Sequence, residues 1–378
     1  MKCLLWTDGF TPRMGGIEVQ GLHFLRGMQA SGHQFHIIAN QDQIDWPQSE
    51  CIENTPIERF QFNALIEKKT LSELKRIDQA LNTILTQFKP DVIHLYTCTG
   101  GAAIVYLLMR ARFLTIPTIL TVHGIFTPDF KIDPLIDRVL KAVDHISCVS
   151  QAVLMQLRIY APLAAQKAGV IHNGLPLPDL IPSSLSFAPP TLACIARLSP
   201  EKGIDVILHA LALVKEAIPT IRLLIAGDGP ERAALLDLTA FLQLQNHVSF
   251  LGPLAPDQIP EVINQSCMIL MPSRMEAFGL TALQSLQMGR PVIASRIGGL
   301  PEIIEHEQSG LLVAMDNIDE LAQAILRLAQ HPEQTQTLGL QGRKRAITQF
   351  SLQNHVERYE ALYQHAVKSK DATYAAVS

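Results

Sequence analysis

The chain has 378 residues and a net charge of −4, and 48% of its residues are hydrophobic and 17% charged. This composition is typical of a globular protein with buried cores and excludes a disordered chain. The mild negative charge gives no support for a nucleic-acid partner held by bulk charge. At roughly 100–200 residues per domain, the length predicts about two domains.

The beginning of the sequence predicts no secretory signal peptide, because Asp8 and Arg13 interrupt the first apolar run. The most apolar stretch, 100–122, contains Arg110 and Arg112, which favours a helix and a strand over a membrane span of about 20 apolar residues. The six cysteines are widely spaced, as expected for free thiols in a reducing compartment. We therefore expect a cytoplasmic protein.

Short apolar strands alternate with amphipathic helices in the first half of the chain. The expected strands cover 2–7, 34–40, 57–62, 92–96, 118–122 and 145–150, and the expected helices include 16–30, 70–88 and 102–113. Such alternation predicts a parallel sheet covered by helices on both faces.

A proline- and serine-rich segment, 175–190, interrupts the alternation and is predicted to be a linker between domains. The pattern then resumes. The expected strands cover 191–196, 221–226, 248–251, 268–271, 291–294 and 310–313, and the expected helices lie near 203–216, 231–242, 256–264, 280–288 and 319–329. The tail from 332 to about 368 predicts one or two further helices, so the second half is also an α/β domain.

Several common catalytic motifs are missing from the sequence. It contains no G-x-x-x-x-G-K-[ST], and no G-x-G-x-x-G follows the first strand, which disfavours a P-loop NTPase and an NAD enzyme. It also lacks H-E-x-x-H, G-x-S-x-G and a D-x-D pair. These absences argue against a zinc protease, a serine hydrolase and a transferase that grips Mn²⁺ with paired aspartates.

The strongest motif present leads from a strand of the second half into a helix that begins near Gly279. The amides of Phe278, Gly279 and Leu280 would be unpaired at the helix N-terminus and suit a phosphate or a sugar hydroxyl. Glu276 precedes them, and Gln284 lies about one and a half turns into the helix. The alternative is an ordinary strand-to-helix turn with a solvated glutamate.

A second motif places Arg197 and Lys202 after the strand expected at 191–196. The carboxyl ends of strands are where open α/β sheets bind ligands, and two cations there suit a diphosphate. The alternative is a capped helix with exposed charges.

The first half carries two weaker signals. Gly15 and Gly16 follow the first strand, where paired glycines let the backbone approach an anion closely. His123 ends another strand and could hydrogen-bond a sugar. The alternatives are a plain turn and a structural histidine.

These motifs, in this order, resemble glycosyltransferase family 4. The resemblance covers nearly all of the chain and is most specific in the second half. Its motifs are Arg197 with Lys202, Gly227-Asp228-Gly229-Pro230-Glu231, Glu276-x7-Gln284, Gly298-Gly299-Leu300-Pro301-Glu302 and Ser309-Gly310-Leu311-Leu312-Val313, preceded by Gly15-Gly16, Lys89-Pro90-Asp91-Val92-Ile93-His94, His123 and Ile171-His172-Asn173-Gly174.

The resemblance implies an α/β protein of the GT-B fold, with two Rossmann-like, doubly wound parallel-sheet domains facing a central cleft. An acceptor-binding domain would span 1–180, with a helix at about 352–370 crossing back onto it, and a donor-binding domain would span 188–350. The implied activity is retaining transfer of a hexosyl unit from a nucleotide diphosphate sugar, by family frequency UDP-linked. The acceptor would be an unidentified hydroxyl on a glycolipid, polysaccharide or small molecule, and neither metal nor further cofactor is implied.

The resemblance also implies a role for each site residue. Arg197 and Lys202 would hold the diphosphate and stabilise the leaving group, and Glu276 would contact the transferred sugar beside the amides of Phe278, Gly279 and Leu280. Gly15, Gly16 and Gly227 would belong to the donor site. His123 would lie near the sugar.

Gln284 departs from the family pattern, which usually has a glutamate that binds the ribose hydroxyls. Losing the charged acceptor would cost about 1–2 kcal/mol, or roughly tenfold in donor affinity. Two alternatives therefore stay open: a catalytically weak GT-B domain that binds or scaffolds a partner, and another GT-B-like enzyme such as a nucleotide-sugar epimerase or a phosphorylase.

A basic surface in the first half could dock on anionic lipid. Lysines and arginines lie among apolar positions on and before the helix expected at 70–88, and two more follow in the same domain. They are Lys68, Lys69, Lys75, Arg76, Arg110 and Arg112. Such docking would be peripheral contact with the inner membrane face, and the alternative is a solvated helix surface.

Overall fold

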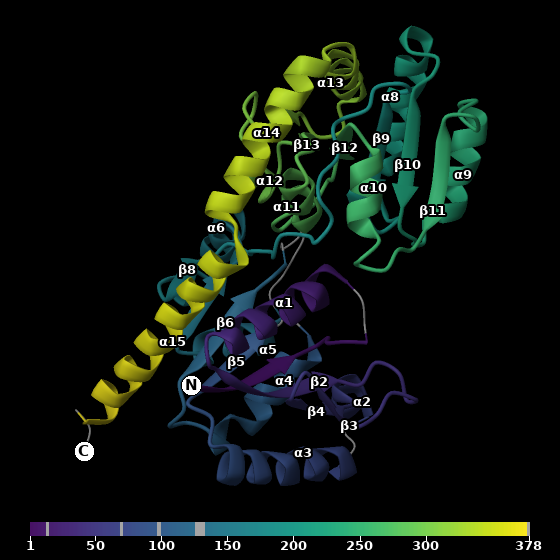
Figure 1. Cartoon of the computed structure of the whole chain (residues 1–378). Coiled ribbons are helices and arrows are strands. Elements are labelled where there is room, and N and C mark those ends of the chain that lie inside the picture. The colour runs from purple at the N-terminus through teal and green to yellow at the C-terminus, as the bar shows by residue number, and fades with distance from the viewer. Residues whose placement is uncertain (13–14, 69–70, 97–99, 125–132, 376–378) are drawn as a thin grey trace. The chain divides into compact units, whose positions relative to one another are not determined.

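The computed structural model describes residues 1–12, 15–68, 71–96, 100–124 and 133–375. The chain divides into two compact units, one formed by Met1–Gly174 with Leu352–Ser378 and the other by Leu175–Ser351 (Figure 1). The first is called unit 1 and the second unit 2. The proline-rich segment 175–190 lies within unit 2.

Unit 1 is built on an eight-stranded sheet in the order β3-β4-β2-β1-β5-β6-β7-β8. All neighbours pair in parallel except β3 with β4, which are antiparallel. The strands are β1 (Lys2–Thr7), β2 (Gln34–Asn40), β3 (Ser49–Ile52), β4 (Thr55–Phe60), β5 (Val92–Tyr96), β6 (Thr118–Val122), β7 (His145–Cys148) and β8 (Ala168–Val170). Every residue of β5 and β6 is buried, as expected for central parallel strands covered on both faces.

The helices of unit 1 include the last helix of the chain. They are α1 (Gly16–Ala30), α2 (Phe62–Lys68), α3 (Leu71–Thr83), α4 (Gly101–Met109), α5 (Pro134–Ala142), α6 (Gln151–Tyr160), α7 (Pro162–Ala165) and α15 (Leu352–Ala375). The single helix expected over 70–88 is wrong only at its end, because α3 continues to Thr83 and a π-helical turn of five residues covers Ile84–Phe88. Lys89 then takes a left-handed conformation (φ 53°), and Pro90 follows and cannot continue a helix.

Helix α15 is attached to unit 1 through buried polar groups. His94 in β5 lies 2.7 Å from the Tyr363 hydroxyl through Nδ1 and 2.7 Å from Thr121 Oγ1 through Nε2. The Tyr359 hydroxyl is 2.8 Å from both Thr121 Oγ1 and Ser147 Oγ. Because these groups have their hydrogen bonds satisfied inside the core, they fix α15 against β5, β6 and β7.

Unit 2 has a six-stranded, fully parallel sheet in the order β11-β10-β9-β12-β13-β14. Its strands are β9 (Thr191–Ile195), β10 (Arg222–Ala226), β11 (Val248–Gly252), β12 (Met268–Met271), β13 (Val292–Ser295) and β14 (Gly310–Val313). Its helices are α8 (Ile204–Ala217), α9 (Arg232–Phe241), α10 (Ile259–Gln265), α11 (Leu280–Gln287), α12 (Leu300–Ile303), α13 (Ile318–Gln330) and α14 (Pro332–Gln349).

The strand order of both sheets follows the doubly wound pattern, in which the winding direction reverses beside the first strand of the unit. The reversal falls between β1 and β5 in unit 1 and between β9 and β12 in unit 2. The predicted α/β class with two doubly wound parallel sheets is therefore confirmed. Ligands of such sheets bind at the carboxyl ends of the strands, at the reversal.

The basic surface expected in the first half is partly neutralised. Arg76 pairs with Glu73 at 2.6 Å, and Arg112 pairs with Asp78 at 2.6 Å. Lys75 is exposed, whereas Lys69 lies outside the described residues. Among the helices that the structure describes, none combines the length and the apolar character needed to cross a bilayer.

Acid is expected to destabilise unit 1 through its buried histidines. Burial lowers the pKa of His123 to about 3 and that of His355 to about 4, and it lowers the pKa of His94 well below the ordinary value. The unfolded chain, with histidine pKa values of about 6.5, therefore binds more protons below that pH. Stability is fully present above about pH 6.5 and falls on acidification, by up to about 1.4 kcal/mol for each pKa unit of depression.

Urea unfolding monitored by hydrogen exchange in each unit at about pH 7.5, 6 and 5 measures this loss. The pH dependence of unit 1 should weaken in His123→Gln. It should stay unchanged in His331→Gln, which alters an exposed histidine of unit 2. Equal stability of wild-type unit 1 across this range would contradict the prediction.

Candidate functional site

The reversal point of unit 2 brings together two of the predicted residues. β9 ends at Ile195 and β12 at Met271, and these strands are neighbours in the sheet. The loops that follow them carry Lys202 and Glu276, which are 74 residues apart in sequence. Lys202 Nζ donates a hydrogen bond of 2.8 Å to Glu276 Oε2, with side chains only 24% and 16% exposed.

The two loops can come this close because one of them turns at a glycine. Gly203 has a left-handed conformation (φ 64°), and a Cβ there would lie 2.2 Å from the Pro272 carbonyl oxygen. The Glu201 carbonyl accepts the amides of Arg274 and Met275 at 2.7 and 3.3 Å. Backbone contact therefore sets the spacing between the lysine and the glutamate.

Arg197 lies on the same loop as Lys202 and is exposed. Its guanidinium makes no hydrogen bond or ion pair with any residue that the structure describes. The loop is supported by Gly227, whose φ is 129° and where a Cβ would lie 1.9 Å from the Ala196 carbonyl oxygen. Gly227 thus permits a close backbone approach to the loop that presents Arg197, at the carboxyl edge of the sheet.

The N-terminus of α11 opens at the same edge. Gly279 is its N-cap and has φ 111°, a conformation that disfavours any side chain, and a Cβ there would lie 2.8 Å from Leu300 Cδ2. The helix begins at Leu280, so the amides of its first turn have no intrahelical acceptor. Phe278 is buried in the core of the unit. Gln284 is half-buried one turn later, and no described residue bonds its side chain.

Gly15, Gly16 and His123 belong to unit 1. Gly15 is the N-cap of α1, and a Cβ there would lie 2.4 Å from Glu18 Oε2. Residues 13 and 14 of this motif lie outside the described residues. The motif follows β1, whose carboxyl end lies at the reversal point of this sheet, where doubly wound sheets generally bind ligands.

His123 follows β6 and is 6% exposed, with its ring centroid 4.1 Å from that of Tyr96. Burial lowers its pKa to about 3, so the imidazole is neutral at physiological pH. Its Nε2 is buried without a hydrogen-bond partner among the described residues. An unpartnered buried nitrogen is costly, and a bound hydroxyl could satisfy it. Tyr96 was not predicted as a neighbour, because β5 gave only a strand signal.

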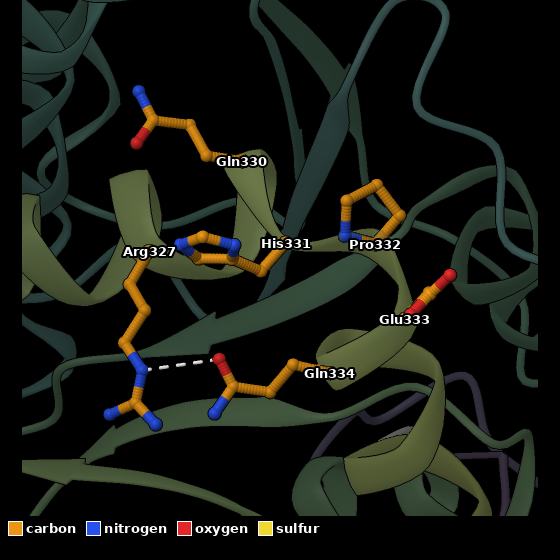
Figure 2. Close-up of a pocket in the computed structure, with 6 residues that line it drawn as sticks. All are labelled: Arg327, Gln330, His331, Pro332, Glu333 and Gln334. Carbon is orange, nitrogen blue, oxygen red and sulfur yellow. Dashed lines mark hydrogen bonds between the residues drawn. The ribbon is translucent and has the colours of Figure 1, made fainter.

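A surface hollow elsewhere in unit 2 carries no comparable chemistry. Figure 2 shows its lining at the junction of α13 and α14: Arg327, Gln330, His331, Pro332, Glu333 and Gln334. Arg327 donates to Gln334 at 3.3 Å and to both carboxylate oxygens of Glu307 at 2.6 Å. Since α13 runs back toward the amino ends of the strands, this hollow lies at the edge opposite to Arg197.

The arrangement in unit 2 suits an anion bound next to a polar group. Arg197, Lys202 and the first turn of α11 supply positive charge, and Glu276 supplies a carboxylate that contacts one of the cations. Within the described residues, no three histidine, cysteine, aspartate or glutamate side chains gather as metal ligands.

Known protein families match both halves of the chain. Residues 14–179 match the model described as Glycosyltransferase Family 4, and residues 182–345 match the model described as Glycosyl transferases group 1. Together the two models cover nearly the whole chain.

Individual relatives match this chain over most of their own length. A phosphatidylinositol N-acetylglucosaminyltransferase subunit of Schizosaccharomyces pombe is 24% identical over 345 residues, covering 88% of this chain and 74% of the relative. The N-acetyl-alpha-D-glucosaminyl L-malate synthase of Bacillus anthracis is 22% identical over 370 residues, covering 93% of this chain and 94% of the relative.

A solved structure shows the same fold. Anabaena HepE, determined in complex with UDP-glucose, aligns with a TM-score of 0.76 and 22% identity over 96% of this chain and 100% of that chain. The two units therefore have the GT-B fold.

Proposed function

Because the chain belongs to glycosyltransferase family 4, a family of retaining glycosyltransferases that use nucleotide-sugar donors, we propose that it transfers a hexosyl unit from a UDP-linked donor to a hydroxyl acceptor. The observation that carries the proposal is the reversal point of unit 2. There, an unpaired Arg197, the Lys202–Glu276 pair and the α11 N-terminus share one edge of the sheet. UDP is supported by HepE, which was solved with UDP-glucose, and a hexosyl unit by two relatives named for N-acetylglucosamine transfer.

The proposed chemistry places the diphosphate on the cations. When the bond between C1 of the sugar and the phosphate oxygen breaks, negative charge grows on the leaving diphosphate. Arg197, Lys202 and the α11 amides would stabilise that charge without reorganising. Lys202 would exchange Glu276 for the diphosphate, and the released carboxylate would then accept hydrogen bonds from the sugar hydroxyls.

Retention of configuration requires attack from the face that the diphosphate leaves, or two successive inversions. In the first route, the acceptor hydroxyl attacks C1 while a phosphate oxygen takes its proton. In the second, a nucleophile of the protein attacks C1 and releases the diphosphate, which gives a short-lived covalent intermediate. The acceptor hydroxyl then attacks C1 and releases that nucleophile. Within unit 1, Gly15 and Gly16 would let the first turn of α1 face an anion, and the unpartnered Nε2 of neutral His123 would bind a hydroxyl group.

The acceptor is proposed only at the level of a hydroxyl group. One relative is named for phosphatidylinositol and the other for malate, so the similar proteins do not share an acceptor class.

A donor panel tests the proposal. Purified protein is incubated with UDP-glucose, UDP-N-acetylglucosamine, UDP-galactose and GDP-mannose, and both nucleotide release and the fate of the sugar are followed. We expect UDP release from at least one UDP-hexose. Release of GDP alone would contradict the UDP assignment. A changed sugar still attached to UDP would indicate an epimerase, and binding without turnover would indicate the scaffold alternative.

Restoring the usual glutamate should strengthen donor binding. In the proposed site Gln284 faces the ribose, and a carboxylate can accept from both ribose hydroxyls, whereas an amide offers one acceptor. Gln284→Glu should lower the Kd for UDP by roughly tenfold, with little change in kcat because the ribose is remote from the breaking bond.

Calorimetric titration of UDP measures this change. Gln308→Glu, an exposed glutamine-to-glutamate change in the same unit, controls for added charge. An unchanged or weaker affinity in Gln284→Glu would show that Gln284 does not face the ribose as proposed.

Activity is expected to persist in the presence of a metal chelator. The two cations and the helix amides would do the electrostatic work that a metal performs in transferases with paired aspartates. Initial rates should agree within about twofold before and after addition of EDTA. Rates that vanish with EDTA and return with Mn²⁺ would contradict this mechanism.

A further inference from the structure

Arg274 differs from the other cations at the reversal point because its donors are already used. Its Nε donates to Asp316 at 2.7 Å, and its Nη2 donates to Asp205 at 2.7 Å. Its Nη1 donates to Asp205 at 3.0 Å and to the Pro200 carbonyl at 2.6 Å. Four of the five N–H donors of a guanidinium are therefore engaged, and two carboxylates balance its charge.

These partners lie on three loops of one sheet edge. Arg274 itself follows β12, two residues before Glu276. Pro200 and Asp205 flank Lys202, in the loop after β9 and the first turn of α8, and Asp316 follows β14. The Arg274 side chain consequently joins the loop of the glutamate to the loop of the lysine.

We infer that Arg274 is a positioning residue for the transfer reaction, acting through a clasp formed by Arg274, Asp205, Asp316 and the Pro200 carbonyl. The clasp fixes the position of Glu276 relative to Lys202, whereas Arg197 and Lys202 bind the diphosphate. This inference rests on the proposed function for its effect on turnover, but the clasp itself is a property of the free protein.

The clasp resists an outward displacement of the loop that carries Glu276. Without the guanidinium, Asp205 and Asp316 are left without their shared cation, and the two loops stay joined by the backbone bonds of Arg274 and Met275 to Glu201 and by the Lys202–Glu276 hydrogen bond. Like charges left close together repel. An outward shift of about 1 Å at a catalytic group can lower turnover roughly 100-fold.

A positioning role for Arg274 can be distinguished from direct binding of the phosphate. If Arg274 bound the phosphate, its truncation would weaken the affinity of the protein for the donor. If Arg274 is a positioning residue, its truncation should lower turnover while the donor affinity is nearly unchanged. Arg327 provides a matched control, because it makes a two-pronged ion pair with Glu307 in the same unit but at the opposite edge of the sheet.

The test compares Arg274→Ala, Arg274→Lys and Arg327→Ala with wild type in three measurements. Hydrogen exchange of residues 272–279 reports the loop, calorimetry with UDP reports the binding stoichiometry and Kd, and initial rates with the wild-type donor give kcat. For Arg274→Ala we expect faster exchange, full stoichiometry, a Kd within about threefold and a kcat lowered roughly 10- to 100-fold.

Arg274→Lys should lie between these values, since lysine can reach only one carboxylate at a time, and Arg327→Ala should match wild type. Removing Asp205 as well should add little to the loss in Arg274→Ala, because both substitutions break one interaction.

Several outcomes would overturn the inference. Unchanged exchange and kcat in Arg274→Ala would show that the clasp holds nothing. A raised Kd for UDP with an unchanged kcat would show that Arg274 binds the donor directly, and a binding stoichiometry that falls together with kcat would indicate a general folding defect.

If Arg274→Ala does not fold, Asp316→Asn removes one of the two carboxylates of the clasp and is assessed by the same measurements. If wild type turns over no donor, the proposed function fails, and hydrogen exchange still decides the clasp.

Discussion

Removal of either cation at the reversal point of unit 2 should cause a large loss of transfer activity. Arg197→Ala and Lys202→Ala each delete one charge-assisted contact to the leaving diphosphate, which costs about 2–4 kcal/mol, or roughly 30- to 1000-fold in kcat/KM. The two variants should differ in kind. Arg197 makes no hydrogen bond or ion pair with a described residue, whereas the loss of Lys202 also leaves Glu276 without its cation.

Steady-state kinetics with the wild-type donor measure both losses, and circular dichroism checks folding. Arg222→Ala is the matched control, because this arginine is exposed at the first residue of β10, on the amino edge of the same sheet. It should change kcat/KM by less than about twofold, in keeping with the weak effects of surface charges. Near-normal rates in both folded Arg197→Ala and Lys202→Ala would remove the proposed site.

Glu276→Gln should lower turnover more than donor affinity. The amide keeps the size of the side chain but loses the charge that would meet the transferred sugar as it acquires positive character. A loss of roughly 100- to 1000-fold in kcat is expected, as for other preorganised electrostatic contacts. Affinity for UDP should be kept or should rise, because Lys202 no longer divides its charge between Glu276 and the diphosphate.

Calorimetry with UDP and single-turnover rates with the donor separate the two effects. Glu305→Gln is a suitable control, since this exposed carboxylate pairs with Arg345 outside the site. If Glu276→Gln weakened UDP binding as much as it lowered turnover, Glu276 would be a uniform binding group. Its assigned place beside the reacting sugar would then be wrong.

Much of the fold could be predicted because parallel strands buried on both faces leave continuous apolar runs. β5, β6 and β9 are such strands and lie where the pattern indicated. β3, with exposed and half-buried residues, and the three-residue β8 carry no comparable signal and were not predicted. The π-helical turn at Ile84–Phe88 was missed for a different reason, because its apolar spacing continues that of α3.

The candidate site was predictable in its parts and less so in its connections. Strand ends and glycine positions pointed to Arg197, Lys202 and Glu276 separately. Their proximity follows from β9 and β12 being neighbours, which the order of strands in sequence does not give directly. Sequence also does not distinguish Arg274 from Arg197, although one is saturated by carboxylates and the other has no partner among the described residues. That distinction depends on long-range ion pairs.

A crystal structure of the protein with bound UDP would show directly whether the diphosphate binds at the reversal point of unit 2. We expect the diphosphate at the carboxyl ends of β9 and β12, with phosphate oxygens within hydrogen-bond distance of Arg197, Lys202 and the amides at the start of α11. We also expect Lys202 to turn from Glu276 to the phosphate while Arg274 keeps its carboxylate partners. A diphosphate bound elsewhere, for example in the hollow between α13 and α14, would contradict this assignment.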